Sequence, residues 1–349
     1  METTTLKSFA TKARTDLIKE VGARVSVVLA ENSLARVESL AAVHRLEEAI
    51  VRDGRDQVID RVAYTWFNRI IALRFMDANG YTPSAVVSPE AGRATGQPEV
   101  LAEAKAGVFD SSVVQAKTQE TITALLNRTR PSQDPDGEAY GLLLEVYCRS
   151  WHKAMPFMFE REGDYTELLI PAALLAVDSV RDRAVTTLTE EVCRDVEVIG
   201  WLYQFYISER KDEVFDGFKK NKKAGAAEIP AATQLFTPHW IVRYLVENSL
   251  GRLWLLNNPT SRLAEQMDYY IKPVDEETDF LKVAKPEELK IIDPAVGSGH
   301  MLTYAFDLLY AIYMEKGYDP AQIPSLILQH NLFGTEIDPR AGALAAFAL

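Results

Sequence analysis

The chain contains 349 residues, of which 47% are hydrophobic and 25% are charged, and its formal net charge is −12. These values suit two globular domains with well-filled cores, and they exclude a disordered or collagen-like chain. No apolar run approaches the roughly 18 residues of a membrane span. The polar first 14 residues lack the apolar core of a secretory signal.

Charge and cysteine usage narrow the class of protein further. The negative charge argues against strong DNA binding by this chain alone, because DNA-binding surfaces concentrate lysine and arginine. Cys148 and Cys193 are too far apart in sequence for a zinc knuckle, and the five histidines are scattered. We therefore expect buried thiols in a reducing cytoplasm, with no metal site and no membrane partner.

Apolar residues recur at helical spacing through most of the first 207 residues. A short helical lead-in is expected within residues 1–50, and the clearest signal follows at 56–79, where Asn79-Gly80 supplies a left-handed stop. Further helices are predicted within 138–160, 165–182 and 192–207, and Pro171 is expected at a helix start. No internal repeat is present, so we predict one helical N-terminal domain, residues 1–230.

Two groups of basic residues lie within this domain. Arg61, Arg69 and Arg74 share the helix at 56–79, where we expect a solvated or ion-paired face; a phosphate-contacting face is the alternative. The other group lies in residues 208–229, which we predict to be a loop-like, solvated linker. The alternative for this segment is a mobile phosphate-binding loop at the mouth of an active site. Its lysines are Lys211, Lys219, Lys220, Lys222 and Lys223.

Residues 291–302 have the order of a strand, a tight glycine turn and a helix. β-Branched residues lead into Asp293, Gly297 and Gly299 stand two positions apart, and an apolar helical run begins at Met301. Glycines tolerate positive φ and leave room for a ligand against the backbone, while the next helix points its free N–H groups at that ligand. An adenosyl compound fits a crevice of this kind.

A second strand is predicted within residues 331–338, and it ends at Glu336. A carboxylate there could accept hydrogen bonds from both ribose hydroxyls, so Glu336 indicates a nucleoside without distinguishing one adenosyl cofactor from another. The dinucleotide fingerprint requires Gly or Ala where Leu302 stands, and an acid only about 20 positions after the first glycine turn. An NAD-dependent oxidoreductase is therefore the weakest hypothesis.

Three segments resemble motifs of adenine-specific DNA methyltransferases, and they follow one another along the chain in the order found in that family. Residues 293–300, DPAVGSGH, resemble their S-adenosylmethionine loop, in which Cys more often stands at the position of Val296. Residues 336–338, EID, resemble the acidic motif that ends their second strand, and residues 234–239, QLFTPH, resemble the segment that precedes the loop. Together with segments 201–207 and 248–254, they make the whole chain resemble the front part of PglX-type methyltransferases of BREX phage-defence systems.

The resemblance implies an α/β fold in which a mostly helical N-terminal domain, residues 1–230, precedes a truncated methyltransferase domain, residues 231–349. That second domain would be the start of a Rossmann-like, S-adenosylmethionine-dependent methyltransferase fold. The cofactor-binding residues implied by the resemblance are Thr237, Pro238, Asp293, Ala295, Gly297, Gly299, Glu336 and Ile337. Without the resemblance, Thr237 and Pro238 are explained as the cap and first-turn proline of a helix, and Asp293 as part of an Asp-Pro turn.

The resemblance also implies double-stranded DNA as the partner, held mainly by a later part of the protein, and methyl transfer to the exocyclic amine of adenine. The Asn-Pro-Pro-Tyr type motif that holds the flipped adenine in such enzymes is absent from this sequence, so we assign no catalytic residue. We expect a fragment that binds cofactor weakly and does not catalyse, with an apolar sheet face left exposed. The alternative is a non-catalytic helical docking module for other phage-defence proteins or for a phage inhibitor.

Overall fold

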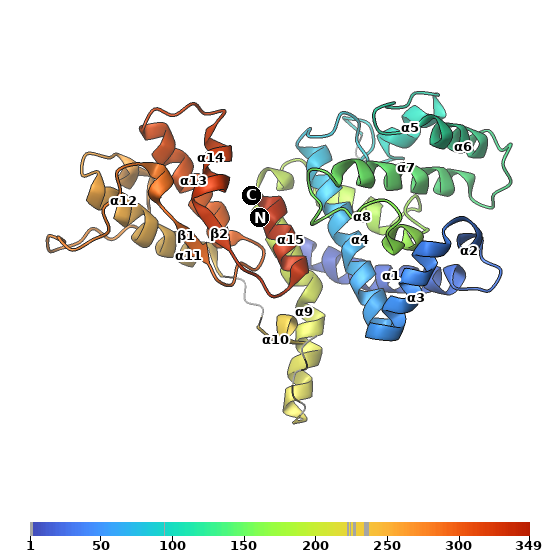
Figure 1. Ribbon diagram of the computed structural model, residues 1–349, viewed down its shortest axis with the longest axis horizontal. Coiled ribbons are helices and arrows are strands. Elements are labelled where there is room, and N and C mark those ends of the chain that lie inside the picture. The colour runs from blue at the N-terminus through green and yellow to red at the C-terminus, as the bar shows by residue number, and fades with distance from the viewer. Residues whose placement is uncertain (1–2, 94, 222, 224, 226–227, 234–236) are drawn as a thin grey trace. The chain divides into compact units, whose positions relative to one another are not determined.

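The computed structural model describes residues 3–93, 95–221, 223, 225, 228–233 and 237–349 (Figure 1). The chain divides into two compact units, Met1–Glu209 and Arg210–Leu349. The predicted boundary at residue 230 separates domains by function, whereas this division separates compact units. The boundary at residue 230 therefore stays a prediction. Within the described residues, no helix has the length and apolar character required to cross a membrane.

The first unit is built from helices. They are α1 (Thr3–Val28), α2 (Leu34–Glu38), α3 (Leu40–Asp53), α4 (Arg55–Ala78), α5 (Glu99–Lys105), α6 (Ala116–Leu126), α7 (Pro135–Trp151), α8 (Val180–Thr187) and the first half of α9 (Glu197–Lys219), with 3-10 turns at Tyr165–Leu169 and Val192–Arg194. The prediction of a short helical lead-in underestimated its length. Helix α1 has 26 residues and packs along α4. The two cysteines are buried, and burial raises the pKa of the Cys148 thiol to about 12 and that of Cys193 to about 11.

Helix α4 lies at the centre of the first unit, and the prediction of a helix at 56–79 is confirmed. Its regularly spaced apolar residues are all buried, namely Ile59, Val62, Trp66, Ile70 and Leu73. The helix ends where predicted, because Gly80 adopts a φ of 68° and the Tyr81 N–H donates to the Met76 carbonyl at 2.9 Å.

Two of the three arginines on α4 are buried structural residues. The Arg69 side chain is 2% exposed, forms an ion pair with Glu160 and lies 4.8 Å from the Trp66 ring centroid. Arg74 donates to the Leu188 carbonyl and to the Ser88 hydroxyl, each at 2.8 Å. A phosphate could not reach either guanidinium, so the phosphate-contacting alternative is wrong for these two.

Two predictions of local structure in this region are wrong. No helix begins at Pro171, which is followed by turns. Helix α8 begins only at Val180, after Asp178 with its positive φ of 59°, and the Ser179 hydroxyl caps it. The start of the segment 208–229 is helical, because α9 continues to Lys219. Ion pairs between Arg210 and Glu213 and between Lys219 and Asp216 stabilise this helix at a spacing of three residues. Lys222 lies outside the described residues.

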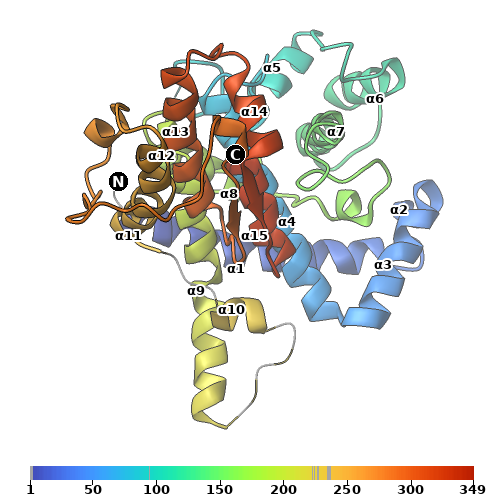
Figure 2. The ribbon, with the colours of Figure 1, turned by 60° about the vertical axis from the view of Figure 1, so that its left-hand side comes forward.

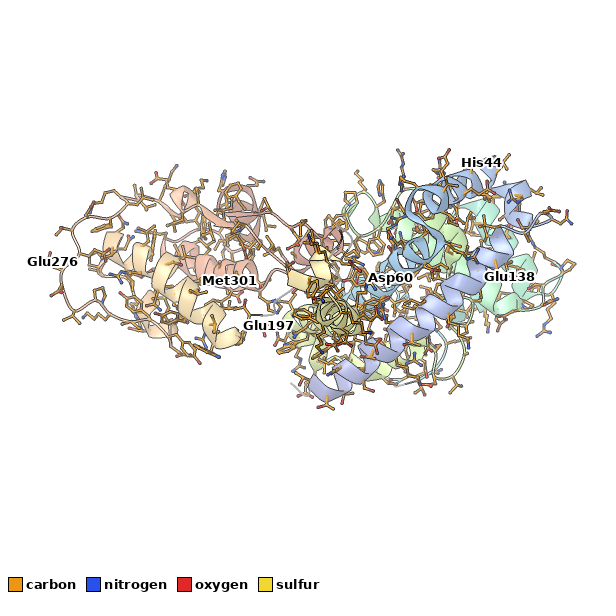
Figure 3. The ribbon with its side chains drawn as sticks, turned by 90° about the horizontal axis from the view of Figure 1, so that it is seen from below. His44, Asp60, Glu138, Glu197, Glu276 and Met301 are labelled. Carbon is orange, nitrogen blue, oxygen red and sulfur yellow. The ribbon has the colours of Figure 1, made fainter. Side chains whose placement is uncertain are left out.

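The second unit contains two parallel strands among its helices. Its elements are the end of α9, α10 (Ile229–Thr233), α11 (His239–Val246), a π-helical turn (Glu247–Gly251), α12 (Arg252–Asn257), 3-10 turns at Leu263–Gln266 and Pro286–Glu288, β1 (Ile291–Asp293), α13 (His300–Glu315), α14 (Ile323–His330), β2 (Leu332–Gly334) and α15 (Pro339–Ala348). Figure 3 labels Met301 on α13 and Glu276 in the long irregular segment between α12 and β1. The order strand, crossover helices, parallel strand is the βαβ unit predicted around the glycine turn.

The register of the sheet decides which side chains reach the core. Ile291 pairs with Leu332 and Ile292 with Phe333, so alternate pairs face opposite sides. Ile291 and Leu332 pack in a core cluster with residues of α11, α12, α13 and α14. Helices α13 and α14 lie next to the strands (Figures 1 and 2). Ile292 remains 68% exposed and Phe333 45% exposed, which confirms the expected uncovered apolar face.

Candidate functional site

The loop between β1 and α13 is held by backbone pairing that continues beyond the strands. The Thr335 N–H donates to the Asp293 carbonyl at 3.0 Å, and the Val296 N–H donates to the Thr335 carbonyl at 3.1 Å. The Asp293 carboxylate accepts the Ala295 N–H at 2.9 Å. Asp293 therefore orders the first turn of the loop, one of the two roles predicted for it.

The two glycines serve different geometrical purposes. Gly297 has a φ of 58°, and a Cβ at this position would meet no atom within 4 Å. Gly299 has a φ of 97° and precedes α13, and a Cβ there would lie 3.2 Å from the Cα of Ala345 in α15. Gly297 thus provides a turn with open space above it, and Gly299 provides a turn against a neighbouring helix.

Glu336, two residues beyond β2, is directed back at the glycine loop. Its Oε2 accepts the Gly297 N–H at 2.7 Å, and its Oε1 accepts the Asp338 N–H at 2.9 Å. The adjacent Ile337 is 68% exposed. The structure therefore brings Glu336, Gly297 and Ile337 together at the carboxyl ends of the two strands, the edge at which parallel sheets bind ligands.

Thr237 and Pro238 do not begin a helix in the predicted way. Helix α11 begins at His239, and Pro238 is its N-cap residue, with extended backbone and no capping side chain. The predicted capping role of Thr237 is therefore wrong, because the helix starts two residues after it. Residues 234–236 of the motif lie outside the described residues. The His239 ring lies edge-on to Tyr304 of α13, with 6.1 Å between centroids, so α11 begins beside the helix that follows the glycines.

Sequence analysis missed a buried polar network that joins α11 to α13. Glu247 is 0% exposed and accepts the Tyr304 hydroxyl at 2.6 Å and the Arg243 Nε at 3.2 Å. The spacing of Arg243 and Glu247 is visible in the sequence as an i,i+4 pair, which normally lies on a solvated helix face. Nothing in the sequence pairs either residue with Tyr304.

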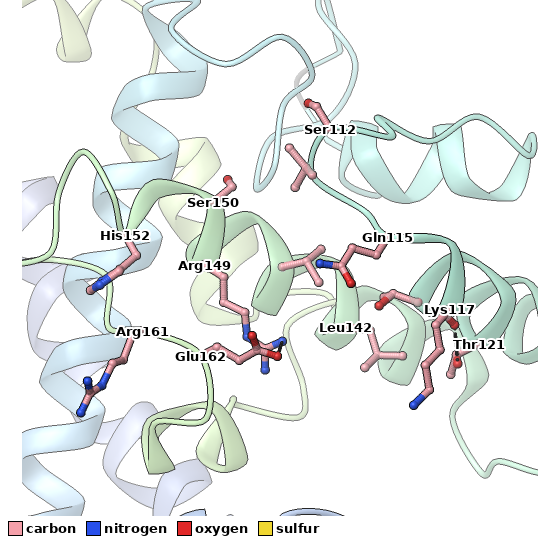
Figure 4. A pocket seen from close by; sticks show the side chains of 13 residues that line it. Ser112, Gln115, Lys117, Thr121, Leu142, Arg149, Ser150, His152, Arg161 and Glu162 are labelled. Carbon is pink, nitrogen blue, oxygen red and sulfur yellow. Dashed lines mark hydrogen bonds and ion pairs between the residues drawn. The ribbon is translucent and has the colours of Figure 1, made fainter.

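The first unit contains a separate open pocket of about 800 Å³ between α6, α7 and the segment after α7 (Figure 4). Arg149 crosses it and binds three carboxylates: both oxygens of Glu167 at 2.7 and 2.9 Å, Glu162 at 3.2 Å, and Glu145. No sequence motif pointed to this pocket, because its lining comes from three segments with ordinary local patterns. Residues of the lining include Lys117, Thr121, Leu142, Arg149, Arg161 and Glu162.

No group of three or more His, Cys, Asp or Glu side chains that could hold a metal ion occurs in the part of the chain that the structure describes. The site in the second unit brings together backbone N–H groups, the carboxylates of Asp293 and Glu336, and the exposed apolar side chain of Ile337. Such a set suits a polar organic ligand with hydroxyl groups and an apolar ring.

These features define an α/β unit with a glycine loop between its first strand and the following helix. The chain is 38% identical to adenine-specific methyltransferase BrxX of Escherichia coli O9:H4 (strain HS), in an alignment covering 100% of the chain and 30% of that protein. It is 36% identical to adenine-specific methyltransferase PglX of Lacticaseibacillus casei (strain Zhang), over 90% of the chain and 27% of that protein. No family model matches the chain. The resemblance to PglX-type methyltransferases is confirmed: the chain matches the N-terminal part of these proteins and spans less than a third of their length.

Replacing Gly299 with alanine tests the packing of the glycine loop. We expect Gly299→Ala to lower the free energy of unfolding by about 1–2 kcal/mol for the left-handed backbone and about 1–3 kcal/mol more for the contact with Ala345. Gly317→Ala is the matched control, because Gly317 has a φ of 79° and open space around it. Urea unfolding followed by circular dichroism measures both, and equal losses would contradict the packing role.

The cluster around Arg149 predicts a pH-dependent stability. Burial, opposed by Arg149 and reinforced by Glu167, raises the pKa of Glu145 from 4.5 to about 7. The stability contributed by its neutral form is present below about pH 4.5 and lost as the pH rises through 7. The effect of Glu145→Gln on the free energy of unfolding should therefore depend on pH. The substitution should be more stabilising at pH 8 than at pH 4.5, by on the order of 2 kcal/mol in urea unfolding.

Glu138→Gln is the control for this prediction, because Glu138 is an exposed carboxylate on the same helix. We expect the difference between the two pH values to be larger for Glu145→Gln than for Glu138→Gln. Equal pH dependence in the two variants would contradict the assignment.

Proposed function

We propose that this chain is the N-terminal part of an adenine-specific DNA methyltransferase, and that residues 231–349 form the first part of its Rossmann-like S-adenosylmethionine-binding domain. The observation that carries the proposal is the Glu336 carboxylate placed 2.7 Å from the Gly297 N–H across the ends of two parallel strands. The names of the matched relatives support the reaction class. The negative charge of −12 supports a division of labour in which later residues hold the DNA.

The residues present fit an adenosyl cofactor. The Glu336 carboxylate offers two acceptor oxygens, the number that a ribose diol requires, and it can exchange its backbone donors for the two hydroxyls. The exposed side chain of Ile337 provides apolar surface for the adenine ring. The open space over Gly297 admits the methionine part of the cofactor against the backbone, with the N-terminus of α13 behind it.

The remaining predicted residues shape the loop around this cofactor. Asp293 and Ala295 form the first turn, which keeps the loop open above β1. Thr237 and Pro238 stand just before α11, and we assign them to the methionine end of the cofactor. When bound, S-adenosylmethionine supplies the activated methyl group for the exocyclic amine of adenine in double-stranded DNA. This sequence contains no Asn-Pro-Pro-Tyr type motif, so we assign no catalytic residue here.

Calorimetric titration with S-adenosylmethionine tests the cofactor site. We expect heat of binding with the 349-residue chain, and Glu336→Ala should weaken the affinity about 100-fold or more, because two hydrogen bonds to a charged group are lost. Glu288→Ala is the control, since Glu288 also accepts a backbone N–H but lies away from the glycine loop. If the unchanged chain produces no heat, the cofactor site is refuted and the helical docking module for phage-defence proteins is favoured.

A radiochemical assay tests the division of labour. We expect the 349-residue chain to transfer no tritium from methyl-labelled S-adenosylmethionine to double-stranded DNA, because it lacks the adenine-holding motif. An active adenine methyltransferase on the same DNA provides the positive control. Labelled DNA formed by this chain alone would show that its own residues complete the catalytic site.

A further inference from the structure

A buried carboxylate stands at the junction of α11 and α12. Glu247 is the first residue of the π-helical turn Glu247–Gly251, and its side chain is fully buried. π-Helical turns are rare and occur frequently at functional sites. Because an unpaired buried carboxylate is costly, the contacts of Glu247 explain why it is tolerated and what it holds.

The hydrogen bonds of this carboxylate come from α11, from α13 and from the segment between α12 and β1. Oε1 accepts the Tyr304 hydroxyl at 2.6 Å and the Arg243 Nε at 3.2 Å, and Oε2 accepts the Tyr269 N–H at 2.6 Å. The Arg243 guanidinium also pairs with the exposed Asp268 at 2.8 Å. The charge of Glu247 is thus matched and its two oxygens are satisfied, which makes the network rigid.

Tyr304 links this network to the glycine loop. It lies one helical turn beyond His300, the first residue of α13, and therefore close to Gly299 along the helix. Burial and the hydrogen bond to Glu247 raise the pKa of Tyr304 to about 12, so its hydroxyl stays protonated and donates. The ring of Tyr304 meets His239 at the start of α11, next to Pro238.

We propose that Glu247, together with Arg243 and Tyr304, is a positioning residue for the cofactor site. By binding the first turns of α13 to α11, it holds the glycine loop at a fixed distance from the segment at Thr237 and Pro238. This inference rests on the proposed function. The network acts through the helices, and none of its three side chains needs to touch the cofactor.

The test compares two tyrosines on the same helix. Tyr304→Phe removes the hydroxyl that binds Glu247, while Tyr313→Phe removes the hydroxyl that donates to Asn331 at 2.9 Å, farther along α13 from the glycine loop. Tyr304→Phe loses two hydrogen bonds, because its hydroxyl also accepts the Arg243 Nε at 3.2 Å, and Tyr313→Phe loses one. A merely structural role therefore predicts a loss of stability in both variants without a difference in cofactor affinity. We expect Tyr304→Phe to weaken S-adenosylmethionine binding about tenfold in calorimetry and Tyr313→Phe to leave it unchanged.

A measurement without cofactor separates this inference from the proposed function. With ¹⁵N-labelled glycine, the amide resonances of Gly297 and Gly299 should shift in Tyr304→Phe and stay in place in Tyr313→Phe. If the unchanged chain binds no S-adenosylmethionine, the proposed function fails, and these resonances then decide only whether the network positions the glycine loop. Resonances that are unmoved by Tyr304→Phe, or affinity losses equal in the two variants, would overturn it.

Glu247→Gln provides a second variant in case Tyr304→Phe unfolds. The amide retains an acceptor for Tyr304 but loses the charge that Arg243 matches, so the affinity should again fall while thermal unfolding reports the stability. The double variant Glu247→Gln/Tyr304→Phe should weaken binding by less than the sum of the two single losses, because both residues belong to one hydrogen-bonded network with Arg243. Additive losses would show that they act independently and would overturn the proposal.

Discussion

The hydrogen bond from the Gly297 N–H to the Glu336 carboxylate connects two segments that are separated by α13 and α14. It depends on the parallel pairing of β1 with β2, because that pairing places the loop after one strand beside the loop after the other. A shift of one residue in register would turn Ile291 and Leu332 away from the core and move Glu336 from the glycines. The core of the second unit therefore maintains the geometry of the site.

The same hydrogen bond stabilises the loop when no ligand is bound. An amide and a carboxylate that are both suited to bind a cofactor satisfy each other, so neither group needs to be buried unpaired. A ligand must then offer the Glu336 carboxylate better donors than one backbone N–H. The two hydroxyls of a ribose meet this requirement, whereas an anionic ligand would be repelled.

Three buried charged side chains, Arg69, Arg74 and Glu247, join elements within the two units. In the first unit Arg69 and Arg74 join α4 to distant segments through carbonyl and hydroxyl acceptors. In the second unit Glu247 joins α11 to α13 in the same manner. Each such group is costly to bury and is tolerated because its partners are complete, which makes one arrangement of the helices strongly preferred.

The sequence by itself determined the elements whose signals are local. The period of the apolar residues in α4, the glycine stop at Gly80 and the strand–turn–helix order around Gly297 all depend on neighbours in the chain, and they predicted the structure correctly. The resemblance to PglX-type methyltransferases could also be recognised from the sequence, because its motifs are short and occur in a fixed order.

Only the tertiary structure decided which distant residues meet. The burial of Arg69, the pairing of Glu247 with Tyr304 and the approach of Glu336 to Gly297 each join segments far apart in the chain. A charged side chain in a helix has the same local pattern whether it faces water or a buried partner, since its environment is set by the packing of other elements. For that reason the residues of the candidate site could be named from the sequence, but the network that positions them could not.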